Sequence, residues 1–193
     1  MIPPDFRFNV SQWRACIVED IQPPPTAEFK TCLDPSFTSA DKSDASAIAT
    51  GWLDDYDQSV DGMRGLNVVE IKVGHWYGME LPRQVVNTLR EWAPKEVNVE
   101  KQPGADLLCD TIALQSELHN VTTGRIRQFI SRSPKPNRIY RLQGLLNTSM
   151  LRIQRGSHVE VLLEQAENYL FTVSNSGRDD DALDVLAMLA GFR

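Results

Sequence analysis

The sequence predicts an α/β protein with one mixed β-sheet and helices on both faces of that sheet. Two observations favour this fold class. Three apolar, β-branched segments follow one another before residue 74, which indicates an antiparallel meander. From Pro82 onward, segments with helical spacing of apolar residues alternate with short β-branched segments. A chain of 193 residues, 41% hydrophobic and 24% charged, is long enough for one domain with a buried core.

The three strands of the predicted meander span residues 28–33, 45–52 and 66–73. The first alternates and ends at Asp34-Pro35, a sequence that begins a turn. A polar loop separates it from the second strand, whose residues are small and apolar. An acidic turn with two glycines leads to the third strand. Short connections of this kind favour antiparallel pairing of neighbouring strands.

The second half of the chain alternates helices with strands. Pro82 opens the first helix at a position where its missing N–H costs nothing, and Pro94 ends that helix. The predicted helices span residues 82–92, 104–118, 137–148, 159–169 and 180–190, and the predicted strands span 96–100, 127–130 and 151–153. Three adjacent strands followed by alternating helices and strands form the element order of a ribonuclease H-like fold.

Residues 1–28 differ from the rest of the chain. Prolines at positions 3, 4 and 23–25 interrupt any long element, although residues 12–21 could form a short helix. We therefore predict that residues 1–28 are a linker or N-terminal arm and that residues 29–193 form the domain.

The net charge of −6 is unevenly distributed along the chain. Residues 121–158 contain eight basic residues and no Asp or Glu, so the remainder carries −14. This asymmetry indicates either a surface that faces a polyanion or a solvated basic face, and charge alone favours neither. The eight are Arg125, Arg127, Arg132, Lys135, Arg138, Arg141, Arg152 and Arg155.

Several function classes lack their sequence signals. The three cysteines are scattered and fit neither a disulfide framework nor a zinc site, which indicates reduced buried thiols. The three histidines are far apart and show no metal spacing. No apolar run reaches the ~18 residues of a membrane span, no signal peptide is apparent, and G-x-S-x-G is absent.

Acidic residues occur where the predicted topology brings chain segments together. Asp34 ends the first strand of the meander, Glu100 ends the fourth strand, and Asp180, Asp181 and Asp184 begin the last helix. We expect the first and fourth strands to be parallel neighbours, so that their carboxyl ends open onto one crevice. Crowded carboxylates repel one another, and hard divalent cations such as Mg²⁺ or Mn²⁺ relieve that repulsion. Two such ions can act together in phosphodiester displacement.

Each acidic feature taken alone also has a structural explanation. Asp34 could begin a turn, Glu100 could end a strand in solvent, and the Asp180-Asp181 pair could interact with a helix dipole. Their occurrence in one predicted crevice favours the functional interpretation over three separate structural ones.

Three segments resemble motifs of the nuclease domain of viral or bacteriophage DNA-packaging terminase large subunits. Leu33-Asp34-Pro35 together with residues 43–48 is similar to the first acidic motif. Residues 97–101, followed by 104–108, are similar to the second, and residues 180–187 are similar to the third. The resemblance runs from about residue 28 to the C-terminus.

The resemblance implies a metal-dependent endonuclease that cuts double-stranded concatemeric viral DNA by a two-metal mechanism. It implies that Asp34, Glu100, Asp180 and Asp181 are catalytic and bind two Mg²⁺ or Mn²⁺ ions, with Asp184 as a further metal ligand. Which of Asp180, Asp181 and Asp184 is the essential third acid stays open. An ATPase motor domain, a portal and a small terminase subunit are implied partners, with the host cytoplasm as the site of action. No G-x-x-x-x-G-K-[ST] motor motif occurs in this sequence.

Basic residues near the acids are candidates for DNA contacts. Our candidates are Arg132, Lys135, Arg138 and Arg141, at the start of the predicted helix 137–148, together with Lys101 beside Glu100. Phosphate contacts of this type would set affinity and salt dependence, not sequence preference. With a net charge of −6 we expect weak, salt-sensitive DNA binding.

Two other functions stay open at this point. The same fold and acids would suit a resolvase, a transposase or a ribonuclease H. A catalytically silent module that binds nucleic acid or protein would also preserve the fold, but its acids would bind no metal.

Overall fold

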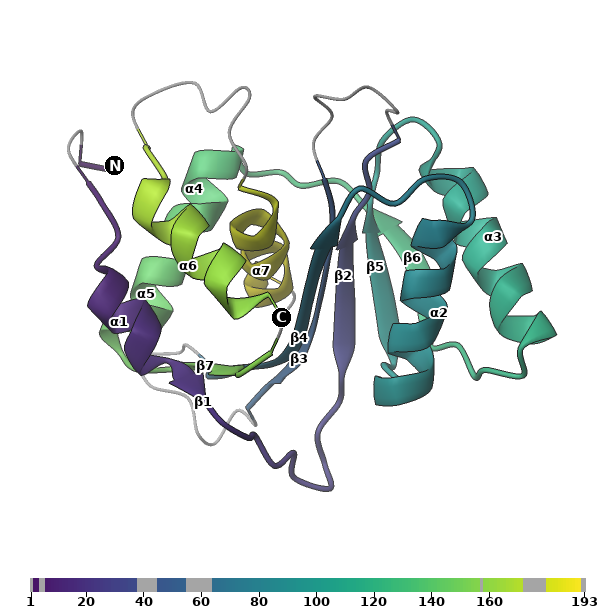
Figure 1. The fold of residues 1–193 in the computed structure, drawn as a ribbon, viewed down its shortest axis with the longest axis horizontal. Coiled ribbons are helices and arrows are strands. Elements are labelled where there is room, and N and C mark those ends of the chain that lie inside the picture. The colour runs from purple at the N-terminus through teal and green to yellow at the C-terminus, as the bar shows by residue number, and fades with distance from the viewer. Residues whose placement is uncertain are drawn as a thin grey trace.

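The computed structural model describes residues 2–3, 6–37, 45–54, 64–156, 158–171 and 180–191. Within these residues the chain forms a seven-stranded mixed sheet in the order β1-β7-β4-β3-β2-β5-β6 (Figure 1). The strands are β1 Ile17–Val18, β2 Lys30–Asp34, β3 Ser46–Leu53, β4 Leu66–Gly74, β5 Glu96–Glu100, β6 Arg125–Phe129 and β7 Leu151–Gln154. The helices are α1 Val10–Ala15, α2 Glu80–Trp92, α3 Ala105–Leu118, α4 Lys135–Tyr140, α5 Leu142–Asn147, α6 Val159–Asn168 and α7 Asp181–Gly191.

The sheet has the predicted mixed topology. Strands β2, β3 and β4 pair antiparallel as a meander. Strand β5 pairs parallel with β2, β6 pairs parallel with β5, and β7 pairs parallel with β4. The predicted fold class is therefore confirmed, and so is the expectation that the first strand of the meander and the strand at residues 96–100 are parallel neighbours.

Helices cover both faces of the sheet (Figure 1). Helices α2 and α3 lie on one face, and α7 lies on the other with α4, α5 and α6 around it. Side chains alternate between the two faces along a strand, so Leu33 and Val99 pack in the core under α2 and α3, whereas Cys32 packs in the core that contains α7. By the same alternation Asp34 and Glu100 face the α7 side.

Helix α7 is buried on all sides. Residues 181–189 are all buried, because the helix lies between the sheet and helices α4 and α6. A helix in this environment is apolar around its whole circumference, which explains why Leu183, Leu186 and Leu189 are accompanied by further apolar residues between them.

The N-terminal segment is more core-like than its sequence indicates. Strand β1 pairs parallel with β7, and the side chains of Phe8, Trp13 and Ile21 are buried. The short helix expected at residues 12–21 is α1, which begins earlier and ends at Ala15. Tertiary packing orders this segment despite its prolines; its role as a linker or arm to another domain stays a prediction.

One further difference from the predicted elements lies in the second half of the chain, and two predicted segments cannot be compared. The helix expected at residues 137–148 is two short helices, α4 and α5, which meet at Arg141. The Ser43-Asp44 part of the first motif and most of the acidic turn before β4 lie outside the described residues. Among the described residues, no helix combines the length and apolar character needed to cross a membrane.

Candidate active site

Asp34 and Glu100 lie side by side at one end of the sheet. Leu33 pairs with Val99 in the parallel register of β2 and β5, so the next residue of each strand is Asp34 and Glu100 respectively. Neighbouring strands are about 4.8 Å apart, and both carboxylates point to the α7 side. The two acids therefore lie together at the ends of neighbouring parallel strands, as predicted.

The α7 acids lie at the same end of the sheet. Asp180 precedes the helix, and its backbone carbonyl accepts the Asp184 N–H at 2.9 Å. Asp181 accepts the backbone N–H of Ala45, directly before β3, at 3.2 Å. Asp180, Asp181 and Asp184 are only 3%, 5% and 1% exposed. These carboxylates are therefore held in the protein interior beside the ends of β2 and β3.

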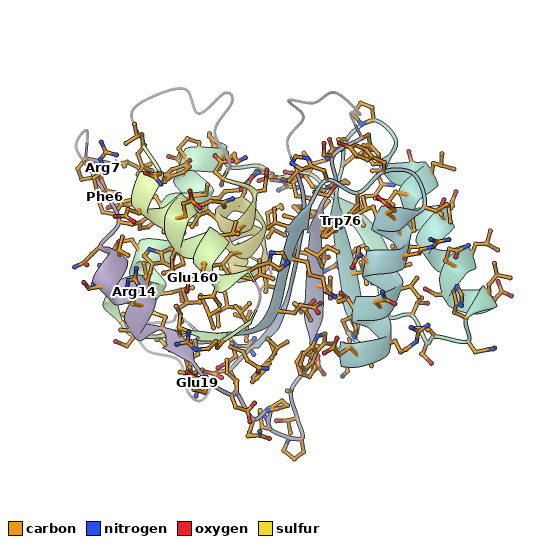
Figure 2. All side chains as sticks on the ribbon, in the orientation of Figure 1. Phe6, Arg7, Arg14, Glu19, Trp76 and Glu160 are labelled. Carbon is orange, nitrogen blue, oxygen red and sulfur yellow. The ribbon has the colours of Figure 1, made fainter. Side chains whose placement is uncertain are left out.

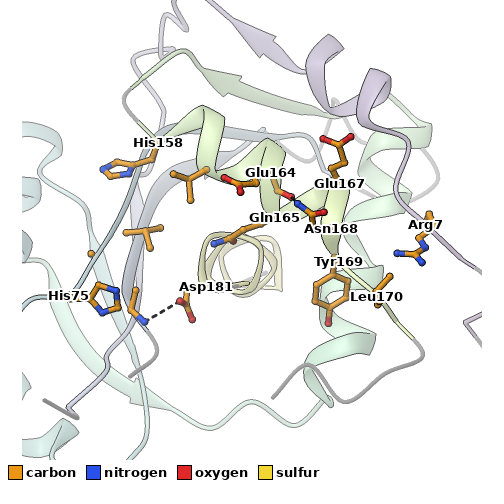
Figure 3. A pocket seen from close by; sticks show the side chains of 14 residues that line it. Arg7, His75, His158, Glu164, Gln165, Glu167, Asn168, Tyr169, Leu170 and Asp181 are labelled. Carbon is orange, nitrogen blue, oxygen red and sulfur yellow. Dashed lines mark hydrogen bonds between the residues drawn. The ribbon is translucent and has the colours of Figure 1, made fainter. Parts of the chain in front are cut away.

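Gln165 of α6 fixes the start of α7. Its side-chain oxygen accepts the backbone N–H groups of Ala182 and Leu183 at 2.9 and 3.3 Å. These N–H groups have no partner within a helix, and a buried donor without a partner is costly. Figure 3 looks along α7 and shows Gln165 directed at it, with the hydrogen bond from Ala45 to Asp181 dashed. Sequence analysis did not identify Gln165, which no local pattern distinguishes.

Two cations from α4 lie among the acids. Lys135 Nζ is 2.5 Å from Asp180 Oδ1 and 3.3 Å from Asp184 Oδ2. The Arg138 guanidinium binds both carboxylate oxygens of Asp184, with Nη2 2.5 Å from Oδ2. Its Nη1 is 3.3 Å from Glu100 Oε1. Arg138 thus connects the acid of β5 to the acid of α7.

The electrostatics of the site favour added positive charge. Burial, together with the charges of Glu100 and Asp184, raises the pKa of the Asp34 carboxyl from 3.8 to about 8. Burial acts to lower the pKa of Lys135, but the carboxylates of Asp184 and Asp180 raise it above its ordinary value. Asp34 is therefore disfavoured as an anion, whereas Lys135 stays charged.

The predicted DNA-contacting residues fall into two groups. Lys135 and Arg138 are paired with the acids, whereas Lys101, Arg132 and Arg141 are exposed. The chain between β6 and α4, which includes Arg132, crosses the end of the sheet where the acids lie (Figure 1).

Five of the eight basic residues of the 121–158 stretch form ion pairs: Arg127, Lys135, Arg138, Arg152 and Arg155. Folding thus neutralises part of the sequence asymmetry.

The donor set of the site consists of carboxylate oxygens, which suits hard divalent cations. In the present arrangement, no three His, Cys, Asp or Glu side chains of the described residues are placed to hold a metal ion together. The ammonium of Lys135 and the guanidinium of Arg138 lie among those oxygens instead. The residues fit a metal by their chemistry and burial, and metal binding would require Lys135 to move.

A cavity of about 700 Å³ opens beside Asp181 (Figure 3). Many of its wall residues come from α6 and the end of β4, and polar side chains among them include His75, His158, Glu164, Gln165 and Asn168, together with Asp181. Of the five acids, only Asp181 lines this cavity. The cavity is therefore distinct from the cluster that Asp34 and Glu100 form with the other acids.

Comparison with known structures shows the fold. The chain is similar to the nuclease domain of the large terminase subunit gp2 of bacterial virus Sf6, with a TM-score of 0.64 and 15% identity over 96% of this chain and 98% of that chain. RuvC of Thermus thermophilus and the fowlpox virus Holliday junction resolvase, both 13% identical, have TM-scores of 0.43 and 0.45; they cover 84% and 82% of this chain and 90% and 92% of their own. No protein-family model and no curated protein matches the sequence. The expected resemblance is thus confirmed at the level of the fold, which is ribonuclease H-like.

Proposed function

We propose that this protein is a metal-dependent endonuclease that cuts double-stranded DNA, in the role of a terminase nuclease domain acting on concatemeric viral DNA. One observation carries the proposal: five carboxylates from β2, β5 and the start of α7 converge at one end of the sheet. The likeness in fold to the Sf6 nuclease domain over nearly the whole chain supports it.

Asp34, Glu100, Asp180 and Asp181 are the proposed ligands of Mg²⁺ or Mn²⁺, with Asp184 as a further ligand. Two such ions would supply positive charge to the attacking and leaving oxygens of a phosphodiester displacement. Burial and the charges of Glu100 and Asp184 raise the pKa of Asp34 and so disfavour its ionised form. A bound cation would offset both effects, which supports this assignment.

Arg138 has a positioning role in this proposal. Its planar guanidinium donates two bonds to Asp184 and also lies against Glu100. Two-pronged pairs of this kind fix both distance and direction. Arg138 therefore holds the acids of two separate elements in register and offsets their repulsion.

Lys135 is placed to exchange partners. With its side chain 35% exposed, it contacts Asp180 and Asp184 from the solvent side of the site. Ions at these oxygens would displace the ammonium, which would then be available to a DNA phosphate. Lys101, Arg132 and Arg141 are proposed to contact neighbouring phosphates. The motor domain, portal, small subunit and host cytoplasm stay part of the proposal through the terminase resemblance.

Supercoiled plasmid provides the test. The protein is incubated with plasmid in EDTA, Mg²⁺ or Mn²⁺, beside the variants Asp34→Asn and Glu100→Gln. The matched control is Glu160→Gln, which removes an exposed acid from the first turn of α6, an element that supplies none of the five carboxylates (Figure 2). We expect nicking and linearisation with metal for the wild type and the control, and at least a 100-fold loss in both site variants.

The other outcomes are equally informative. Cleavage that persists in both site variants would point to a contaminant or another site and would contradict the assignment. If neither metal supports cleavage by the wild type, the catalytically silent binding module becomes the better description of this chain.

A further inference from the structure

A second, smaller cavity lies at the same end of the sheet but on its other face. It has a volume of about 330 Å³ and lies between the starts of α2 and α3. The residues that line it, named here the aromatic pocket, are Ser36, Phe37, Trp76, Tyr77, Gly78, Met79, Leu81, Pro82, Gly104, Leu107, Leu108 and Thr111. None of them is charged, in contrast to the acidic centre on the α7 side.

Several large apolar side chains of the aromatic pocket are exposed to solvent. Phe37, Tyr77 and Leu107 are 44%, 47% and 72% exposed. Large apolar groups scattered over a surface are ordinary, but several gathered around one cavity indicate a binding site. Aromatic walls in particular suit a flat ring as ligand.

The walls of the pocket are fixed in place. The Trp76 ring lies against Gly74 of β4, where a Cβ atom would come within 2.7 Å of it (Figure 2). The Phe37 ring lies 3.5 Å from the position a Cβ would occupy on Gly104, whose φ of +94° favours glycine. The Gln102 side chain donates to the carbonyl of Pro35 and so ties the Phe37 loop to the start of α3. The pocket therefore exists before any ligand arrives.

The pocket is close to the acidic centre. Phe37 follows Asp34 by three residues, and Gly104 follows Glu100 by four, so chain length alone keeps each within about 10–14 Å of an acid. A nucleotide carries an anionic phosphate and a flat aromatic base a few ångströms apart. The end of the sheet presents matching surfaces for the two parts: a cation-binding centre on one face and an uncharged aromatic pocket on the other.

We infer that the aromatic pocket binds an unpaired nucleobase of the DNA strand whose phosphodiester is held at the acids. The inference rests on the proposed function and deepens it. A base inside a duplex has both of its faces covered by neighbours, so only a base that has left the stack can lie against Tyr77 and Phe37. The favoured substrate is therefore DNA that is locally opened, or a strand end, at the site of cleavage.

The test uses a DNA strand with the fluorescent base 2-aminopurine, whose emission falls when the base stacks on an aromatic ring. The full chain is titrated with a single-stranded oligonucleotide and with its duplex, in Ca²⁺ in place of Mg²⁺ or Mn²⁺, because Ca²⁺ is also a hard cation that binds carboxylate oxygens. We expect quenching by the single strand, with affinity about 10-fold weaker in Tyr77→Ala and in Phe37→Ala. Leu118→Ala, which removes an exposed leucine at the far end of α3, is the matched control and should bind like the wild type.

Several results would overturn the inference. One is equal quenching by wild type, control and both aromatic variants; another is stronger quenching when the 2-aminopurine is fully paired. A dimer in light scattering that Tyr77→Ala converts to monomer would make the pocket a self-association surface. Circular dichroism verifies that the variants fold. The plasmid assay separates the two proposals: cleavage that depends on Asp34 without single-strand quenching would defeat the base pocket alone, and quenching without cleavage would defeat the nuclease alone.

Discussion

The two faces of the sheet differ sharply at the end where β2 and β5 stop. On the α7 side, charged groups are buried: Asp184 is 1% exposed and is held by Arg138. On the α2–α3 side, apolar groups are exposed, with Leu107 72% exposed. Each arrangement is unfavourable for an isolated folded chain, because burying charge and exposing large apolar groups both cost free energy. The pairing of the two suggests one ligand with an ionic part and an apolar part.

The largest expected effect on stability comes from removing Arg138, the cation that pairs with the buried acids on the α7 side. Arg138→Ala leaves Asp184 and Glu100 without their guanidinium, so we expect a loss of about 3–5 kcal/mol in the free energy of unfolding. Urea denaturation measures it. Arg141→Ala, at an exposed position at the end of the same helix, should change stability by less than about 0.5 kcal/mol. Similar losses in both variants would mean that the buried pairs are not the source.

The stabilisation of the protein by metal ions should depend on the acids and not on the aromatic pocket. At about 100 times its dissociation constant, Mn²⁺ should add about 2.7 kcal/mol of stability to the wild type. The same addition should have little effect on Asp34→Asn, whereas Leu107→Ser in the aromatic pocket should respond like the wild type. Thermal unfolding with and without EDTA checks this, and an equal response of all three proteins would place the ions elsewhere.

The Asp34 carboxyl should make stability depend on pH. Its pKa is about 8 in the folded protein and about 4 when unfolded, so the folded state binds more protons between these values. Stability of the wild type should therefore fall as pH rises from about 4 to 8, and Asp34→Asn should lack this component. In EDTA we expect the variant to be more stable by about 2 kcal/mol at pH 8, with the difference shrinking at pH 5. A variant less stable than the wild type at pH 8 would contradict the unfavourable charge at Asp34.

A smaller effect is expected at Gln165. Gln165→Ala removes the acceptor for two buried N–H groups at the start of α7 and should cost about 1 kcal/mol. Gln165→Glu retains an acceptor but adds negative charge, so it should restore little stability and should slow cleavage through the acids beside it. Unfolding and plasmid cleavage measured on the same preparations separate the two consequences.

Much of the fold could be predicted from the sequence because local patterns determine it. Alternation of apolar residues located β2, β4 and β5, and their order alone indicated that Asp34 and Glu100 would end neighbouring strands. Helix α2 followed from its bounding prolines. These features depend on spacing of two or 3.6 residues, which a single sequence displays directly.

Other features depend on contacts between distant segments, which spacing does not reveal. Strand β1 forms because β7 offers an unpaired edge, and its own two residues carry no strong signal. Lys135 and Arg138 were predicted to contact DNA because they belong to a basic stretch at the start of one predicted helix. The structure pairs them with Asp180 and Asp184 because α4 packs directly on α7.

Helix α7 supplies the centre of the larger core and two of the acids, and Asp180 directly before it supplies a third. Residues 181–191 of α7 insert between helix α4 and strands β2, β3 and β4, all of which come earlier in the chain. A chain that lacks α7 exposes an apolar sheet face and has an incomplete set of carboxylates. Completion of the core and assembly of the acidic centre therefore occur in one folding step, when α7 packs against the sheet.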